Sequence, residues 1–366
     1  MLSLGIVGLP NVGKSTLFNA LTSGAADVSN YPFATIDQNV GQVPVPDPRL
    51  RELERLLAPS ECTPCFVQFI DIAGLVRGAS RGEGLGNQFL GHIRQVDALV
   101  HLVRCFPDPD IVHVLDRVDP ARDVSVVETE LMLADLEVLG RIVSKQQNTW
   151  KTDPRTHARE KEQFLLFQRC LEDGVPLRSL DLDPQAQRRL KGLGLLTGKP
   201  VVYVANVAEE DYPLGEDQPC VRSLGAEVAP AGPNPVLVVS ASLDHELQQL
   251  EPEDREEFLN ELDLPAPGPE RLIGRGFRLL DLVTFYTVAR NKLRAWEIPR
   301  GTTAVRAAGK IHTDMERGFI RAQVASGAEL CRIGNWKEMH DKGRIRTEGR
   351  EYEIEDGDVV EFLFSP

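Results

Sequence analysis

The sequence predicts an α/β protein with a doubly wound, mainly parallel sheet, an inserted helical hairpin and a small C-terminal domain. Three observations support this fold class. Short apolar runs alternate with segments that can form helices, one interval between two runs is far too long for a single crossover, and alternating β-type segments follow near the C-terminus. The 366 residues suffice for two or three domains.

Five apolar runs are expected to form the strands of the main sheet. The first comprises residues 4–7, and the others comprise residues 66–70, 99–103, 201–205 and 236–239. Buried parallel strands are apolar along their whole length, because helices cover both faces of the sheet. We therefore assign residues 1–122 and 199–275 to one discontinuous domain.

The interval between the third and fourth runs is expected to form a helical hairpin, residues 123–198. Leucine and valine recur there at helical spacing, first around Leu131 and again near Phe164, after Asp153-Pro154. Two interpretations stay open: an arm that binds a partner, or a solvated embellishment of the surface.

A linker rich in proline and glycine, residues 263–269, ends the discontinuous domain. The following residues, 281–366, are expected to form a small mixed or β-rich domain. Alternating segments are found at residues 284–288, 293–298, 351–354 and 359–364, with a tight turn at residues 355–358.

The composition is that of an ordinary globular protein, and the formal net charge is −14. Such a charge argues against a protein that coats nucleic acid with its whole surface. There is no apolar stretch long enough to span a bilayer, and the first strand begins almost at Met1. The six cysteines are scattered, which suits a reducing compartment. We expect a cytosolic protein without a membrane partner; its oligomeric state, a monomer or a nucleotide-dependent dimer, stays open.

The loop Gly8-Leu9-Pro10-Asn11-Val12-Gly13-Lys14-Ser15 fits the phosphate-binding pattern G-x-x-x-x-G-K-[ST] between a strand and a helix. Its backbone N–H groups and the helix N-terminus attract phosphate oxygens. Lys14 would clamp the β- and γ-phosphates, and the Ser15 hydroxyl would ligate Mg²⁺. The nucleotide-binding residues expected here are Asn11, Val12, Gly13, Lys14, Ser15 and Thr16.

Four further polar motifs suit a nucleotide switch, and three of them directly follow apolar runs. Asp71-Ile72-Ala73-Gly74 places a carboxylate that could reach Mg²⁺ through water and an N–H group of Gly74 that could meet the γ-phosphate. Thr35, at the end of Asn30-Tyr31-Pro32-Phe33-Ala34-Thr35, offers a third metal ligand beside Ser15 and Asp71. Asn206-Val207-Ala208-Glu209 and Ser240-Ala241-Ser242 follow later runs.

Together these motifs resemble the Obg-like ATPases of the YchF type, within the P-loop GTPase superfamily. The resemblance includes Ala308-Gly309-Lys310-Ile311-His312-Thr313-Asp314 and Gly318-Phe319-Ile320-Arg321-Ala322, so it spans nearly the whole chain. It implies that residues 123–198 form an α-helical coiled-coil arm and that residues 281–366 form a TGS domain with a ubiquitin-like β-grasp fold.

The choice of base depends on Asn206-Val207-Ala208-Glu209, which replaces the N-K-x-D motif of ordinary GTPases. The carboxylate of Glu209 is one methylene longer than the guanine-reading Asp, and Val207 replaces the lysine that packs on the base. Losing that Asp weakens the preference for GTP, and the resemblance implies ATP. We expect ATP to be bound by Asn206, Val207, Glu209, Ser240 and Ala241; a GTP-preferring translational GTPase is the alternative.

Unaided hydrolysis is expected to be slow, because Leu75 stands where Ras-like enzymes keep a water-orienting glutamine. Asn11 resembles the asparagine that helps related enzymes to hold a monovalent cation such as K⁺. His113 is the candidate for a movable water-orienting group, with His92 and His101 as weaker ones. The expected catalytic set is therefore Lys14, His113 and Asn11, although a lone histidine is more often a packed side chain.

Residues 290–321 contain eight basic and three acidic side chains, an excess that suits RNA phosphates and stacked bases. A basic face that pairs with the acidic domain is the alternative. TGS domains accompany translation factors, so the resemblance implies a ribosome, RNA or translation-related partner for this domain and the arm. We expect a Mg²⁺-dependent ATPase switch; the alternative is a nucleotide-dependent binding module in which hydrolysis is incidental.

Overall fold

The computed structural model describes residues 1–23, 40–72, 85–152, 154–229 and 236–365. The chain forms two compact units. The N-terminal unit comprises Leu2–Gln42 and Gln68–Leu272, and the C-terminal unit comprises Met1, Val43–Val67 and Ile273–Pro366. Among the helices so described, none has the length and apolar character needed to cross a membrane.

The N-terminal unit is built on a six-stranded sheet with the order β2-β4-β1-β5-β6-β7. Its strands are β1 (Leu2–Val7), β2 (Val40–Pro44), β4 (Phe66–Asp71), β5 (Ala98–Arg104), β6 (Val201–Asn206) and β7 (Val236–Val239). The pairs β1–β5, β5–β6 and β6–β7 are parallel. Each of the five predicted apolar runs lies in a strand of this sheet, and β1 and β5 are buried along their whole length. The predicted parallel α/β fold is confirmed.

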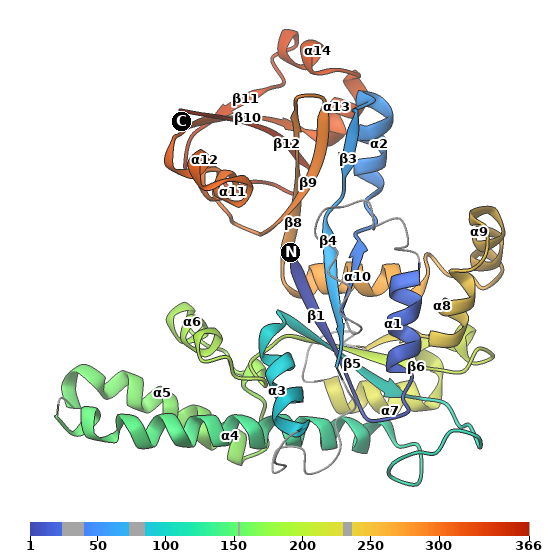
Figure 1. The fold of residues 1–366 in the computed structure, drawn as a ribbon, viewed down its shortest axis with the longest axis vertical. Helices are drawn as coiled ribbons and strands as arrows, with labels where there is room; N and C mark the ends of the chain where they lie inside the picture. The colour runs from blue at the N-terminus through green and yellow to red at the C-terminus, as the bar shows by residue number, and fades with distance from the viewer. Residues whose placement is uncertain (24–39, 73–84, 153, 230–235, 366) are drawn as a thin grey trace. The chain divides into compact units, whose positions relative to one another are not determined.

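Helices surround this sheet (Figure 1). They are α1 (Lys14–Thr22), α3 (Leu85–Gln95), α7 (Pro219–Val228), α8 (Ala241–Leu247) and α9 (Pro252–Glu261). Helix α10 (Gly268–Leu279) begins in this unit and continues into the C-terminal unit from Ile273 onward. The start of helix α7 has a local cause. The Gln218 side chain accepts a hydrogen bond from the Val221 N–H, and Pro219, which lacks an N–H group, occupies the first helical position. Its buried face packs on β6 and β7 through Val221 and Leu224.

The helical insertion is also confirmed. It contains α4 (Pro120–Thr152), α5 (Pro154–Glu172), the 3₁₀ turn η3 (Leu177–Ser179) and α6 (Pro184–Gly192). Figure 1 shows α4 and α5 side by side as a hairpin, and Leu139, Trp150 and Phe167 lie in their shared core. The returning chain is fixed by Asp135, which is fully buried and accepts hydrogen bonds from the N–H groups of Leu196 and Thr197, both at 2.8 Å.

A buried ion pair joins the insertion to the sheet. Arg178, in η3, donates to the carboxylate of Glu128 on α4, and the Tyr203 hydroxyl of β6 donates to the same carboxylate oxygen at 3.0 Å. The other oxygen, Glu128 Oε2, is buried and has no partner among the described residues. The charge of Glu128 therefore depends on Arg178 for its compensation.

The C-terminal unit contains a second six-stranded sheet, with the order β11-β10-β12-β8-β9-β3. Its strands are β3 (Glu61–Thr63), β8 (Leu282–Ala289), β9 (Lys292–Pro299), β10 (Phe319–Ser326), β11 (Arg346–Glu348) and β12 (Asp358–Phe364). Its helices are α2 (Pro48–Leu57), α11 (Ala304–Ile311), α12 (Thr313–Arg317), α13 (Gly327–Ile333) and α14 (Trp336–Asp341). The turn at residues 355–358 is confirmed, since Asp358 N donates to Glu355 O at 3.2 Å. The strand predicted at residues 351–354 is wrong, because Glu353 makes only an isolated bridge to Thr303.

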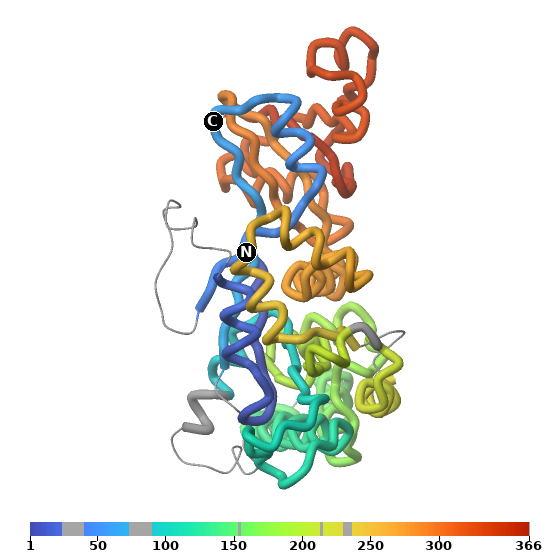
Figure 2. The backbone as a smooth tube through the Cα atoms, turned by 90° about the vertical axis from the view of Figure 1, so that its right-hand side faces the viewer, coloured from blue at the N-terminus to red at the C-terminus, as the bar shows by residue number. Residues whose placement is uncertain are grey.

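The segment Val43–Val67 belongs to the C-terminal unit, although the sequence-based boundaries placed it in the discontinuous domain. Strand β3 pairs in parallel with β9, and Leu50 and Leu53 of α2 share a core with Tyr286 and Met339. In Figure 2 the blue tube of this segment runs among the orange and red elements of the unit. The pairing joins residues far apart in sequence, so no local pattern predicts it.

Candidate nucleotide-binding site

The phosphate-binding loop lies between β1 and α1 and requires glycine at two positions. A Cβ atom at Gly8 would lie 2.4 Å from the Leu102 carbonyl oxygen, and one at Gly13 would lie 2.5 Å from Asn206 Nδ2. Gly13 has a φ of 95° and Asn11 a φ of 61°, both in the left-handed region. This conformation places the N-terminus of α1 at Lys14, where an anion is favoured.

Lys14 is buried, and its ammonium donates to two carbonyl oxygens of its own loop, Leu9 at 2.7 Å and Gly8 at 3.3 Å. Burial lowers the pKa of Lys14 to about 8, and the charge of Asp71 partly opposes this effect. The cation is thus held inside the loop, where phosphate oxygens would replace the carbonyls as acceptors.

Ser15 and Asp71, two predicted metal ligands, lie together although they come from different strand ends. The Ser15 hydroxyl donates to Asp71 Oδ2 at 3.0 Å. Asp71 Oδ1 is buried without a partner among the described residues. An unpartnered carboxylate oxygen beside a hydroxyl is a set of hard oxygen donors that fits Mg²⁺. The other residues predicted here, Thr35 and Gly74, lie outside the described residues, as does Leu75.

Asn206 connects three loops rather than facing a ligand. Its Nδ2 donates to the Val12 carbonyl at 2.9 Å, and its Oδ1 accepts from Ala241 N at 2.9 Å. Val207 is 2% exposed and packs in the core beneath the sheet end. Glu209 is exposed. Within this motif, Glu209 is therefore the carboxylate that remains accessible, and the roles of Asn206 and Val207 are structural in this conformation.

His113 is buried, with both ring nitrogens engaged. Nε2 lies 2.9 Å from Asp123 Oδ2, and Nδ1 accepts a hydrogen bond from Leu115 N at 3.1 Å. Its neighbour Val112 accepts a hydrogen bond from Asn11 Nδ2 at 3.1 Å, so this loop touches the phosphate-binding loop.

The two weaker histidine candidates lie in different surroundings. His101 is buried in β5, where burial lowers its pKa to about 4. His92 is exposed on α3.

One residue of the site escaped the sequence analysis. Arg104, at the end of β5, is 1% exposed and donates to the carbonyl oxygens of Phe106, Asp108 and Ile111 at 3.1, 3.2 and 2.9 Å. Its guanidinium also lies over the Phe106 ring. Arg104 thereby shapes the loop that carries His113. The only signal in the sequence is a charged residue directly after an apolar run.

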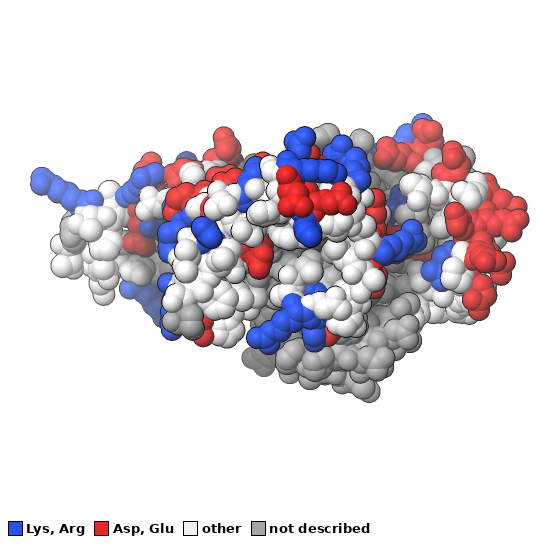
Figure 3. Space-filling model, turned by 90° about the horizontal axis from the view of Figure 1, so that it is seen from above, with Lys and Arg blue, Asp and Glu red and all other residues white. Residues whose placement is uncertain are grey.

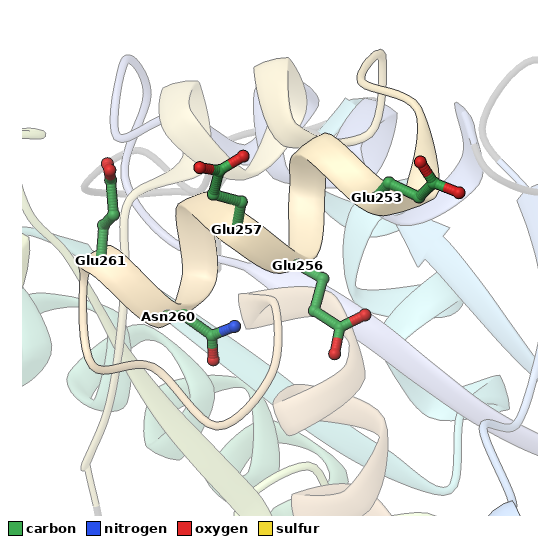
Figure 4. Close-up of a pocket in the computed structure, with 5 residues that line it drawn as sticks. All are labelled: Glu253, Glu256, Glu257, Asn260 and Glu261. Atoms are coloured by element: carbon green, nitrogen blue, oxygen red, sulfur yellow. The ribbon is translucent and has the colours of Figure 1, made fainter.

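A pocket of about 550 Å³ on α9 does not belong to this site. It is lined by Glu253, Glu256, Glu257, Asn260 and Glu261. Figure 4 shows that these side chains point in different directions rather than toward a common centre. Figure 3 shows acidic side chains gathered at the end of the molecule where Figure 1 labels α9. Such a surface repels a nucleoside triphosphate.

Two family models match the chain. One, described as "50S ribosome-binding GTPase", matches residues 3–136, and the other, described as "Protein of unknown function (DUF933)" under the name YchF-GTPase_C, matches residues 282–365. The first covers the phosphate-binding loop and Asp71, and the second covers β8 to β12 of the C-terminal unit.

Relatives of similar length match throughout. The "Ribosome-binding ATPase YchF" of Escherichia coli O157:H7 is 44% identical over 99% of this chain and 98% of its own length. The protein of the same name from Bacillus subtilis is 43% identical over 100% and 99%. The solved structure of the Schizosaccharomyces pombe YchF GTPase, 33% identical, covers 99% of this chain and 97% of its own with a TM-score of 0.87. From these matches and the geometry of its phosphate-binding loop, the chain is a member of the YchF family.

Proposed function

We propose that this protein is a Mg²⁺-dependent P-loop ATPase of the cytosol that hydrolyses ATP slowly to ADP and phosphate and whose nucleotide state controls binding to the ribosome. The observation that carries the proposal is the convergence of Lys14, Ser15 and Asp71 at one end of the sheet. The names of the relatives, ribosome-binding ATPases, support both the reaction and the partner.

At the phosphate end of the site, Lys14 would bind the phosphates and three other residues would ligate the metal. The buried ammonium of Lys14 would transfer its hydrogen bonds from the carbonyls of Gly8 and Leu9 to the β- and γ-phosphates. Ser15 would ligate Mg²⁺ directly, Asp71 through water, and Thr35 as the predicted third ligand. When bound, Mg²⁺ would neutralise phosphate charge.

The base end supports ATP over GTP. Guanine recognition requires a carboxylate held in the plane of the base, where it accepts two hydrogen bonds. The carboxylate at that position is Glu209, which is one methylene longer and exposed, while Asn206 holds Val12 and Ala241 and does not distinguish the bases. With Val207 in the core, no lysine packs against the base from this motif. Ser240 and Ala241, after β7, would contribute backbone contacts.

Slow turnover is consistent with the surroundings of the reacting phosphate. Leu75 has no polar group to orient water, and His113 has both ring nitrogens engaged in this conformation. We propose that His113 leaves this position to orient the attacking water and that Asn11 helps to hold a monovalent cation such as K⁺. Comparing turnover in KCl and in NaCl tests the second point.

Ribosome binding is proposed to use the C-terminal unit, a TGS domain of β-grasp type, together with the inserted arm. Three of its cations are paired, since Lys292, Arg300 and Lys310 contact carboxylates. Four others form no ion pair with any described residue: Arg290, Arg306, Arg317 and Arg321. The guanidinium of Arg294 lies 4.1 Å from the centre of the Trp296 ring. Unpaired cations suit RNA phosphates, and the pair of Arg294 with Trp296 suits contact with a base.

Calorimetric titration with non-hydrolysable ATP and GTP analogues in Mg²⁺ buffer tests the choice of nucleotide. We expect the ATP analogue to bind about tenfold tighter or better, and Lys14→Ala to abolish binding while Lys151→Ala, an exposed lysine of α4, leaves it unchanged. Tighter binding of the GTP analogue would overturn the base assignment.

Sedimentation with ribosomes tests the switch. We expect the ATP-analogue and ADP forms to differ in ribosome affinity, and Arg317→Ala/Arg321→Ala to weaken binding, more so at low salt. Equal affinity of both nucleotide forms would overturn the switch. Full cellular function of a hydrolysis-deficient variant would instead favour the nucleotide-dependent binding module in which hydrolysis is incidental.

A further inference from the structure

The first turn of α4 holds the loop that carries His113. Two consecutive residues make the contacts. Arg122 donates to the carbonyl oxygens of Leu115, at 3.1 Å, and Arg117. Asp123 contacts the His113 ring through Oδ2 and the Arg122 guanidinium through Oδ1 at 3.0 Å. The loop is thus fixed at its far end by α4 and at its near end by Arg104.

These contacts determine the proton positions on His113. The Leu115 N–H can only donate, so Nδ1 must present a lone pair and the ring carries its proton on Nε2. That proton is donated to Asp123 Oδ2 at 2.9 Å. The His113 and Asp123 side chains are only 4% and 3% exposed. The neutral ring therefore has no donor or acceptor left for a water molecule.

The side chain of His113 also faces the interior rather than the nucleotide. Asp123 lies near the thiol of Cys105, whose pKa it helps to raise after burial, and the next residue, Val124, belongs to the core with Cys105. Asn11, in contrast, is exposed on the phosphate-binding loop and touches the backbone of the same segment at Val112. His113 is therefore the next residue after a backbone group that contacts the phosphate-binding loop, although its ring is buried on Asp123.

We propose that Asp123 is a positioning residue that keeps His113 withdrawn, so that hydrolysis requires the His113–Asp123 hydrogen bond to break. This inference rests on the proposed water-orienting role of His113. Asp123 stands on the first turn of α4, a helix of 33 residues that runs into the inserted hairpin. At a rise of 1.5 Å per residue the helix is about 50 Å long. A partner that displaces the hairpin can therefore act on His113 through one continuous helix.

The kinetic test compares four proteins: Asp123→Ala, Asp123→Asn, His113→Ala and the double variant His113→Ala/Asp123→Ala. Removing a charge-assisted hydrogen bond raises the population of the released ring by about tenfold. We expect Asp123→Ala to raise kcat by about that factor with KM for ATP unchanged. Asp123→Asn keeps an acceptor oxygen, so its increase should be smaller. The double variant should be as slow as His113→Ala.

A second readout measures the release of His113 without relying on turnover. Diethyl pyrocarbonate modifies accessible neutral imidazoles, and mass spectrometry of peptides follows each histidine. His92, exposed on α3, serves as the internal reference. We expect His113 to react slowly in the natural protein and about tenfold faster in Asp123→Ala.

The matched control is Glu137→Ala. Glu137 is an exposed carboxylate of the same helix that pairs with Arg141, 14 residues beyond Asp123, so its removal should leave kcat and His113 labelling unchanged. A rise in kcat that persists without His113, a fall in kcat in Asp123→Ala, or unchanged labelling in folded Asp123→Ala and Asp123→Asn would each overturn the proposal. If His113→Ala alone keeps full turnover, the water-orienting role fails, while faster labelling in Asp123→Ala still supports the restraint by Asp123.

Discussion

Asp244, on α8 just after the Ser240-Ala241 segment, should make the stability of the N-terminal unit depend on pH. It is fully buried. Oδ1 accepts a hydrogen bond from Gly268 N at 2.7 Å, at the start of α10, whereas Oδ2 is buried without a partner among the described residues. Burial raises the pKa of Asp244 from 3.8 to about 6, although the bond from Gly268 opposes the shift.

The sign and size of the effect follow from linkage. The folded state holds the proton of Asp244 more tightly than the unfolded state, so this group stabilises folding at low pH and the contribution is lost as pH rises from about 4 to about 6. A pKa raised by about two corresponds to a loss of about 3 kcal/mol in total, of which about 1.3 kcal/mol falls between pH 5 and pH 7.

The perturbation is Asp244→Asn, which keeps the acceptor for Gly268 N but cannot ionise. Urea unfolding of the full chain, monitored at the transition of the N-terminal unit, gives the free energy of unfolding at each pH. We expect the free energy of unfolding of the variant, relative to that of the natural protein, to rise by about 1.3 kcal/mol between pH 5 and pH 7. Asp254→Asn, an exposed carboxylate of α9, should show no such trend. A difference between Asp244→Asn and the natural protein that is constant over this range would refute the reasoning.

Three other perturbations have definite expected outcomes. Gly13→Ala should abolish binding of the ATP analogue in calorimetry, because its Cβ would collide with Asn206. The control Gly140→Ala lies in open space on α4, so it should leave binding intact and raise the free energy of unfolding by about 1 kcal/mol. Asn206→Ala should weaken ATP and GTP analogues alike, by about tenfold, since it removes contacts between loops rather than contacts to a base; a selective loss for one nucleotide would contradict this. Arg178→Met should lower the free energy of unfolding by about 3–5 kcal/mol, because the buried charge of Glu128 loses its partner, and the double change with Glu128→Leu should restore most of it.

The parts of the fold that the sequence predicts are those with a local cause. The apolar strands and the loop from Gly8 to Ser15 are contiguous patterns. Ser15 and Asp71 meet because carboxyl ends of parallel strands lie at one edge of a sheet. The predicted linker lies mainly between α9 and α10, where Asp263 adopts a positive φ.

The parts that were missed depend on contacts between distant or sterically specific residues. The engagement of His113 by Asp123 requires a loop whose path Arg104 fixes, and no spacing rule reveals it. The side chain of Val207 packs in the core, a burial that the motif alone does not reveal, and its contact with a base stays a prediction. The placement of Val43–Val67 depends on β9, which comes much later in the chain.

The interleaving of Val43–Val67 with the C-terminal unit has a consequence for synthesis and for protein engineering. Helix α2 and strand β3 leave the ribosome long before β8 and β9. Leu50 and Leu53 therefore cannot pack against Tyr286 and Met339 until nearly the whole chain has been translated. A truncated chain that starts at residue 281 lacks this segment and would expose Tyr286 and Leu293. The C-terminal unit is therefore no transplantable module: any exchange of it between relatives has to carry the early segment as well.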